Sequence, residues 1–183
     1  HLTKVPYQPN GLRAQSTNPQ TWSSLSDVLR AALRGEYTGI GIMLGGGLCG
    51  IDLDWKSSPA RPFADVPPEA QKIIDRFRSY TEWSPSGKGC HILFHAHLPE
   101  NCQGRKRRLS PTVSLEIYGD GRYFTVTGGR WHELEVTDQQ AALDALLREL
   151  DLLPQDTTPP GAPGPQLNFP PGATPKAAHA LSE

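Results

Sequence analysis

Apolar residues recur at helical spacing in three segments of the chain, and we expect each apolar stripe to face a protein core. The first helix is predicted over residues 24–34, and the second follows a pair of prolines. The third is expected to open with a capping box of Thr137 and Gln140. The stripes consist of Leu25, Val28, Leu29, Ala32, Leu33, Ala70, Ile73, Ile74, Phe77, Leu143, Leu146, Leu147 and Leu150.

Between these helices the pattern changes to short runs typical of strands. The predicted strands are Thr38–Leu44, Leu48–Asp54, Tyr80–Trp83, Cys90–Ala96, Val113–Tyr118 and Arg122–Thr127. Glycine-rich turns at 45–47 and 119–121 predict two hairpins, one joining the first two strands and one joining the last two. Hairpins mixed with helices indicate an α+β fold with a largely antiparallel sheet.

The 18 prolines are unevenly distributed, and eight of them lie beyond residue 153. That stretch holds few charged or aromatic residues, so it offers too little apolar surface to form a core. We therefore expect a folded domain over residues 1–153 and a Pro-rich linker or disordered tail over 154–183. The absent initiator Met and this tether predict a fragment of a longer protein.

Composition narrows the class of protein further. No apolar run approaches the roughly 20 residues of a membrane-spanning helix, so no membrane partner is expected. The three cysteines have scattered spacings that do not form a disulfide framework, which favours a reducing cytoplasm. A formal net charge of -1 at first argues against nucleic-acid binding, which usually comes with a basic excess.

The segment Gly50–Asp54 contains two carboxylates, Asp52 and Asp54, on a predicted strand. Their side chains share one strand face with Cα atoms roughly 6.6 Å apart. Like charges at that spacing repel each other, and a divalent cation such as Mg²⁺ would relieve the repulsion. The alternative is a strand end with solvated acids. Glu116 would add a third carboxylate if it pointed to the same face, giving a set used in nucleotidyl transfer.

The segment Ser84–His91 combines small residues with one positive charge, Lys88. Such a composition can cradle phosphate through backbone N–H groups, although the spacing does not match a Walker A loop. The alternative is a flexible connection between strands. A basic run, Arg105-Lys106-Arg107-Arg108, could contact template phosphates, or it could be a solvated loop.

These motifs, in this order, resemble the archaeo-eukaryotic primase superfamily, and most closely the bifunctional primase-polymerase (prim-pol) domains of phages, plasmids and mobile elements. The resemblance covers residues 4–129 and rests on Lys4–Tyr7, Pro9, Gly11, Ala14, Pro19, Thr21, Trp22, Gly39, Gly41, Gly50–Asp54, Ser84–Gly87, Gly89, His91, Glu116–Tyr118 and Gly121–Gly128. It implies an RRM-like, mainly antiparallel sheet packed on helices, beside a smaller N-terminal αβ unit.

The resemblance also implies roles for individual residues. Three acids would bind divalent metal and a histidine would contact the triphosphate: Asp52, Asp54, Glu116 and His91. A second group would bind the incoming nucleotide: Ser86, Gly87, Gly89, Arg122 and Tyr123. Tyr123 would lie against the sugar and discriminate ribose from deoxyribose, whereas Lys88 is included for its local charge alone.

The implied activity is template-dependent nucleotidyl transfer by a DNA polymerase and primase that uses two Mg²⁺ or Mn²⁺ ions, with no zinc. Its partners would be single-stranded DNA template, primer, NTP or dNTP, and a helicase module after this fragment, in the cytoplasm of a bacterial host of a phage, plasmid or integrated element. One alternative is a catalytically silent DNA-binding module fused to a helicase.

Another alternative is a rolling-circle nickase, in which His95 and His97 bind metal and Tyr118 or Tyr123 attacks DNA. A zinc site of His95, His97, Cys102 and Cys90 matches no ordinary finger spacing. We expect Cys90 to lie in the core instead, and the two histidines to lie on an edge strand.

Overall fold

The computed structural model describes residues 4–56, 66–102 and 106–153. The predicted Pro-rich tail lies outside these residues, so the division of the chain at 153 stays a prediction. The strands are β1 (Ile40–Met43), β2 (Leu48–Trp55), β3 (Tyr80–Trp83), β4 (Gly89–His95), β5 (Arg107–Arg108), β6 (Val113–Tyr118) and β7 (Tyr123–Val126). The helices are α1 (Leu25–Leu33), α2 (Pro68–Phe77) and α3 (Gln140–Glu149), with 3₁₀ turns at Pro19–Thr21 and Glu100–Cys102.

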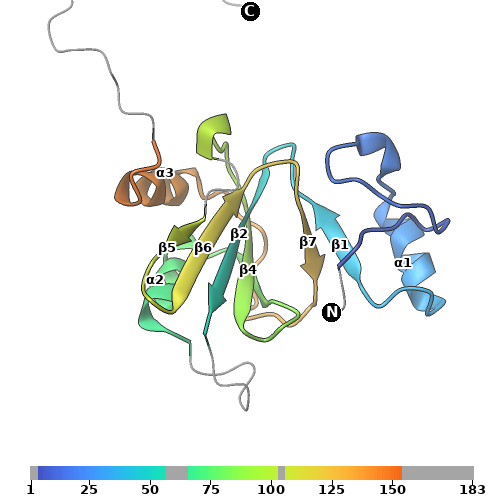
Figure 1. Cartoon of the computed structure of the whole chain (residues 1–183), viewed down its shortest axis with the longest axis horizontal. Coiled ribbons are helices and arrows are strands. Elements are labelled where there is room, and N and C mark those ends of the chain that lie inside the picture. Colours follow the sequence, from blue (N-terminus) through green and yellow to red (C-terminus); the bar gives the residue numbers. More distant parts are fainter. Residues whose placement is uncertain (1–3, 57–65, 103–105, 154–183) are drawn as a thin grey trace, which may run out of the picture. The chain divides into compact units, whose positions relative to one another are not determined.

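Five antiparallel strands form the main sheet, in the order β3-β4-β2-β6-β5. β1 and β7 form a separate two-stranded antiparallel ribbon, which lies between the main sheet and α1 (Figure 1). The predicted α+β class with a mainly antiparallel sheet is confirmed. No helix in the described part of the chain is long and apolar enough to cross a membrane.

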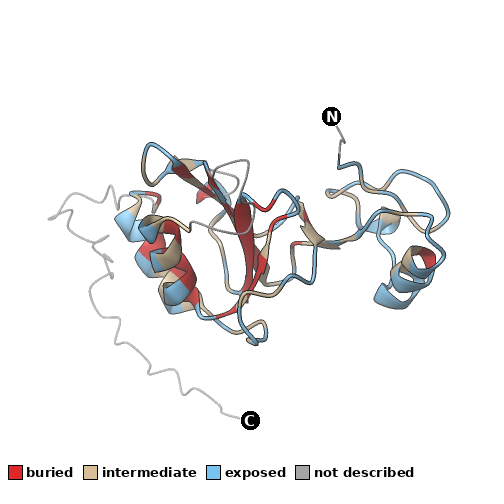
Figure 2. Cartoon of the chain, turned by 90° about the horizontal axis from the view of Figure 1, so that it is seen from below, coloured by how far each residue is buried: buried red, intermediate tan, exposed pale blue. Residues whose placement is uncertain are grey.

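One face of the main sheet packs against α2 and α3 and forms the core. Alternate residues of the three central strands point to this face, and the buried sides of both helices cover them (Figure 2). Pro68 occupies the first turn of α2, where its missing N–H costs no hydrogen bond. α3 begins without the predicted capping box: its N-cap is Gln139, and the Thr137 hydroxyl donates to Arg78 O instead.

Both predicted hairpins are wrong, and they are wrong in the same way. β1 pairs with β7 rather than with β2, and β6 pairs with β2 and β5 rather than with β7. Each glycine turn therefore carries the chain from one sheet to the other. Gly45, Gly46, Gly47 and Gly121 all have positive φ, which lets the chain change direction at these corners.

The ribbon packs on the second face of the main sheet, opposite the helices. Phe124 of β7 is buried there against Leu93 and Leu44. Gly50 makes this approach possible, because a Cβ at that position would overlap the Phe124 ring. The main sheet and β7 therefore enclose the second face from two sides. We call the main sheet its floor and β7 its wall.

The expectation that α1 faces a core is wrong. Leu25, Leu29 and Leu33 recur every fourth residue, yet they are 67%, 43% and 87% exposed, while Ala31 is buried. α1 contacts β1 of the two-stranded ribbon. The small N-terminal unit that contains α1 is held together by polar contacts, such as the hydrogen bond from the Tyr37 hydroxyl to Gln8 O at 2.8 Å. Amphipathic spacing indicated the helix correctly but not what covers its apolar side.

Candidate active site

A row of four polar residues crosses the second face of the main sheet. Glu82 of β3 pairs with His91 of β4, His91 pairs with Asp52 of β2, and Asp52 pairs with Glu116 of β6. Directly paired residues of antiparallel strands share a face, so all four side chains point away from the helices. The strand register thus brings together three residues that the sequence marked as functional and adds a fourth, Glu82.

Asp54 belongs to the next row, beside Gly89 of β4 and Ser114 of β6. Its carboxylate shares the face of Asp52 and is exposed. Gly89 has no room for a side chain, because a Cβ there would overlap Leu53 O and come within 3.1 Å of Asp54 Oδ1. The glycine of the predicted nucleotide loop is therefore needed for strand pairing directly beside the aspartate pair.

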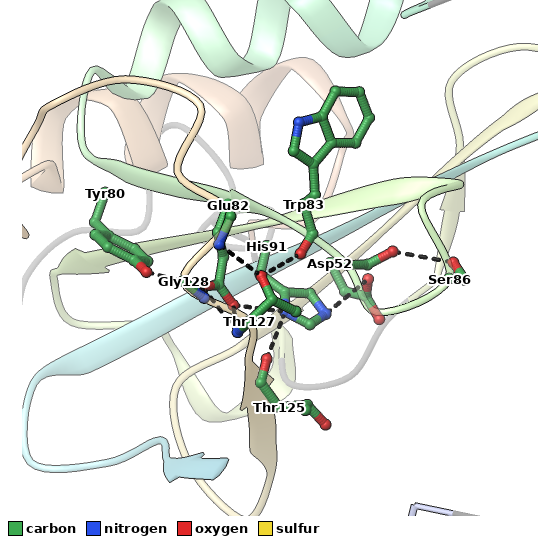
Figure 3. Close-up of polar contacts among 11 residues, drawn as sticks. Asp52, Tyr80, Glu82, Trp83, Ser86, His91, Thr125, Thr127 and Gly128 are labelled. Atoms are coloured by element: carbon green, nitrogen blue, oxygen red, sulfur yellow. Dashed lines mark hydrogen bonds and ion pairs between the residues drawn. The ribbon is translucent and has the colours of Figure 1, made fainter. Parts of the chain in front are cut away.

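His91 lies at the junction of floor and wall and is 4% exposed (Figure 3). Its Nδ1 is 3.2 Å from Thr125 O and 3.6 Å from Glu82 Oε1, while its Nε2 is 3.8 Å from Asp52 Oδ1. Phe124 stacks on the ring at a centroid distance of 4.6 Å. Since both groups facing Nδ1 are acceptors, we assign a proton to that nitrogen, and Nε2 faces Asp52.

Asp52 carries charge that its surroundings do not balance. Burial raises the pKa of its carboxyl group, and repulsion from Asp54 and Glu116 raises it further, while His91 and Lys4 oppose the rise. A cation bound beside the carboxylate would remove this strain. Three carboxylates on one face of the sheet are the type of ligand that a hard divalent ion such as Mg²⁺ or Mn²⁺ prefers.

Glu116 is already engaged within the protein. It accepts a hydrogen bond from the Tyr118 hydroxyl, and Lys106 Nζ lies 3.3 Å from its Oε1. Although burial opposes them, these bonds hold the pKa of Glu116 below its ordinary value. Among the described residues, no three His, Cys, Asp or Glu side chains converge as a ready metal site. Glu116 would have to leave Lys106 and Tyr118 to join the aspartates around an ion.

The loop between β3 and β4 keeps two of its backbone donors for itself. Gly87 N donates to Ser84 O at 2.9 Å, and Lys88 N donates to Ser86 Oγ at 3.2 Å. Gly87 has φ +66° and makes this tight turn possible. These N–H groups are therefore not directed at an anion. Ser86 and Lys88 are the exposed polar residues of this loop, and the Ser86 hydroxyl also contacts the Ser84 hydroxyl at 3.1 Å.

Arg122 and Tyr123 lie at the start of the wall with different surroundings. The Arg122 guanidinium stacks over the Tyr118 ring at 5.0 Å, which brings it to the Glu116 end of the polar row. The Tyr123 ring lies against Gly41 of β1, and its hydroxyl donates to Lys4 O. Because neighbours on a strand face opposite sides, Tyr123 points away from the side on which Phe124 meets His91.

The basic run is divided by strand geometry. Arg105 lies outside the described residues, and Lys106 reaches Glu116. Arg108 pairs with Ser114 and so shares the face of Asp54, whereas Arg107 pairs with Leu115 and shares the helix-covered face. Of the two arginines on β5, Arg108 is the exposed one on the side of the candidate site.

The four residues of the alternative zinc site do not converge in the part of the chain that the structure describes. His95 and His97 are exposed, whereas Cys90 and Cys102 are buried in the helix-side core. The prediction of a core Cys90 is confirmed. The edge-strand expectation for the two histidines is wrong, because β4 is an inner strand that ends at His95, and His97 lies beyond it. Burial and the bond to Glu116 raise the pKa of Tyr118 to about 12, which suits it poorly as a nucleophile.

Glu82 is the residue that sequence reasoning missed. It is 1% exposed, and it lies between Thr81 and Trp83 on a short strand. The sequence pattern that could have identified Glu82 is the alternation of side chains along a strand. If the residues on either side of it point into the core, Glu82 must point to the opposite face. Its partners lie on distant parts of the chain, and local sequence does not identify them.

Sequence comparison now gives the class of protein to which this sheet, wall and acidic row belong. The family model of the bifunctional DNA primase/polymerase N-terminal domain matches residues 1–156, so the chain belongs to that family. A particular relative is the DNA primase-polymerase of Nitratiruptor phage NrS-1, which is 35% identical over 130 residues, or 69% of this chain. The chain spans 18% of that relative's length.

Proposed function

We propose that this domain extends DNA primers on a single-stranded template by metal-dependent nucleotidyl transfer, and that it also starts primers. The proposal rests on one observation above all: Asp52 lies in register between His91 and Glu116, with Asp54 beside it on the same face. A metal-binding edge and a phosphate-binding histidine are then immediate neighbours. That arrangement suits the transfer of a nucleotide from a triphosphate.

In this proposal Asp52, Asp54 and Glu116 hold the metal. Two divalent ions bound there would activate the attacking hydroxyl and neutralise charge on the α-phosphate and the departing pyrophosphate. The attacking hydroxyl would belong to the primer 3′ end or, in priming, to an initiating nucleotide.

The β- and γ-phosphates would be held by groups around the open side of the row. His91 would donate from Nε2 to a phosphate oxygen, and Lys88 and Arg122 would add positive charge. Ser86, Gly87 and Gly89 give the loop its shape and a hydroxyl donor. Tyr123 would reach the nucleotide sugar only if the contact of its hydroxyl with Lys4 O changed.

DNA would approach along the β5 edge. Lys106 and Arg108 point toward the acidic face, and template phosphates are their natural ligands once Glu116 is engaged elsewhere. Arg105 and Arg107 complete the proposed DNA-binding run. We also propose a helicase module beyond this domain.

The deciding experiment is a primer-extension assay with purified protein, DNA template, and Mg²⁺ or Mn²⁺, beside a priming assay on single-stranded template. The matched control is a double variant, Asp52→Asn with Asp54→Asn, purified in parallel. Extension by the wild type alone supports the proposal. Template binding without extension in both proteins would favour the silent DNA-binding module, and a tyrosine–DNA adduct would favour the nickase.

A further inference from the structure

Glu82 is a buried charge for which the proposed chemistry has no use. A carboxylate that is 1% exposed loses its hydration and has to regain that free energy from donors within the protein. A buried carboxylate is stable only when hydrogen bonds hold it in place. A side chain that contacts this fixed carboxylate is then held in place as well.

Three donors other than His91 satisfy the Glu82 carboxylate. Thr127 N lies 3.1 Å from both carboxylate oxygens, Gly128 N lies 3.0 Å from Oε2, and the Tyr80 hydroxyl donates to Oε2 at 2.8 Å. Although burial opposes them, hydrogen bonds hold the pKa of Glu82 below its ordinary value. The side chain is therefore an anion at neutral pH, and it ties β3 to the segment that follows β7.

The same carboxylate also fixes the imidazole of His91 from two directions. Directly, Oε1 lies 3.6 Å from Nδ1. Indirectly, Glu82 holds Thr127, two residues after Thr125, whose carbonyl oxygen lies 3.2 Å from the same nitrogen. Figure 3 shows the ring between Glu82 on one side and Asp52 on the other. Phe124 covers one ring face, so little freedom of rotation is left.

We propose that Glu82 is a positioning residue for the nucleotidyl transfer: it holds the His91 ring with Nδ1–H toward Glu82 and Thr125 O, and so directs Nε2 at the incoming triphosphate. This inference rests on the proposed function, because it assumes that His91 meets the nucleotide. The row then has two kinds of carboxylate. Asp52, Asp54 and Glu116 face the ligands, while Glu82 faces only the protein.

The test compares Glu82→Gln and Glu82→Asp with Tyr80→Phe as the matched control. Tyr80→Phe removes one donor from the same carboxylate without touching His91. Glu82→Gln keeps the size but places an amide against Nδ1–H, and we expect the KM for nucleotide to rise by roughly tenfold, in the range known for residues that orient a ligand-binding histidine. The KM for primer-template should stay at the wild-type value. Glu82→Asp keeps the charge and should recover part of the nucleotide affinity.

A second readout follows the ring itself. In ¹⁵N-labelled protein, with the His91 signals assigned by their loss in His91→Ala, the wild type and Tyr80→Phe should show a protonated Nδ1. Glu82→Gln should alter the Nδ1 signal, because the amide no longer holds Nδ1–H and the ring in one orientation. Unchanged His91 signals and an unchanged nucleotide KM in Glu82→Gln would overturn the proposal and leave Glu82 a structural clamp.

If Glu82→Gln does not fold, Glu82→Asp decides in its place, because its retracted carboxylate should still alter the His91 signals. Unaltered signals in the folded Asp variant would equally overturn the proposal. A wild-type protein that neither extends primers nor binds nucleotide would defeat the proposed function. The NMR comparison would still decide whether Glu82 orients the ring.

Discussion

The polar row has a closed end and an open end. At the closed end, on β3 and β4, the side chains of Glu82 and His91 are 1% and 5% exposed, and protein groups satisfy the carboxylate. At the open end, on β2 and β6, Asp52 and Glu116 are 22% and 23% exposed, and Asp54 is exposed. The closed end is built to stay fixed, while the open end holds excess negative charge that a cation could balance. Fixed groups beside exchangeable ones are what preorganised catalysis requires.

The largest effect should come from removing charge at the open end. Asp52→Asn or Asp54→Asn is expected to lower the rate of primer extension by about a thousandfold, because each removes a proposed metal ligand. The melting temperature of Asp52→Asn should hold or rise, since burial and its acidic neighbours raise the pKa of Asp52 and make the charged form unfavourable in the folded state.

Asp75→Asn, on the exposed side of α2, is the matched control for these two variants and should extend primers normally. Normal extension by the Asp52/Asp54 double variant would refute the assigned site. If the melting temperature of a variant fell by a large amount, unfolding would explain its loss of activity instead.

The closed end is tested by His91→Ala, for which we expect the next largest effect. Loss of one charge-assisted hydrogen bond to phosphate should raise the KM for nucleotide by roughly ten- to a hundredfold. His95→Ala, at the exposed end of the same strand, is the control and should be silent in steady-state kinetics. Equal effects of the two variants would show that position 91 has no special relation to nucleotide.

A smaller effect should appear where the row meets β5. Lys106→Ala removes the cation that now occupies Glu116, so Mn²⁺ should bind more tightly, by about two- to fivefold, as suits a largely exposed ion pair. Electron paramagnetic resonance of free Mn²⁺ without DNA measures this directly, with Lys72→Ala on α2 as the control. Weaker Mn²⁺ binding in Lys106→Ala would show that the lysine assists the site rather than competing with the metal.

The smallest expected effect separates the two arginines of β5. Arg108→Ala should weaken template binding by roughly twofold to threefold and reduce its dependence on salt, because Arg108 lies on the site face. Arg107→Ala should change binding less. Fluorescence anisotropy of labelled single-stranded DNA at several salt concentrations would detect the difference, and the reverse order would contradict the strand register.

Much of the site could be predicted because it depends on alternation within single strands. The side chains of Asp52 and Asp54 share a face in any strand, and the small residues of the 84–91 loop mark a tight turn wherever it lies. Glu82 could not be assigned a role, because its donors Thr127 and Gly128 come from a segment far along the chain. The hairpins failed for the same reason: a glycine turn predicts a change of direction, but not which strand will pair afterwards.

The pairing of β1 with β7 bears on how the domain folds as it is synthesised. Ile40, Ile42 and Met43 emerge from the ribosome early, yet their hydrogen-bonding partners, Tyr123–Val126, are made only after all five strands of the main sheet. Until then β1 is an apolar strand with a free edge, and the exposed leucines of α1 precede it. We therefore expect late closure of the ribbon to limit the folding rate, and chains released before residue 123 to aggregate through this segment.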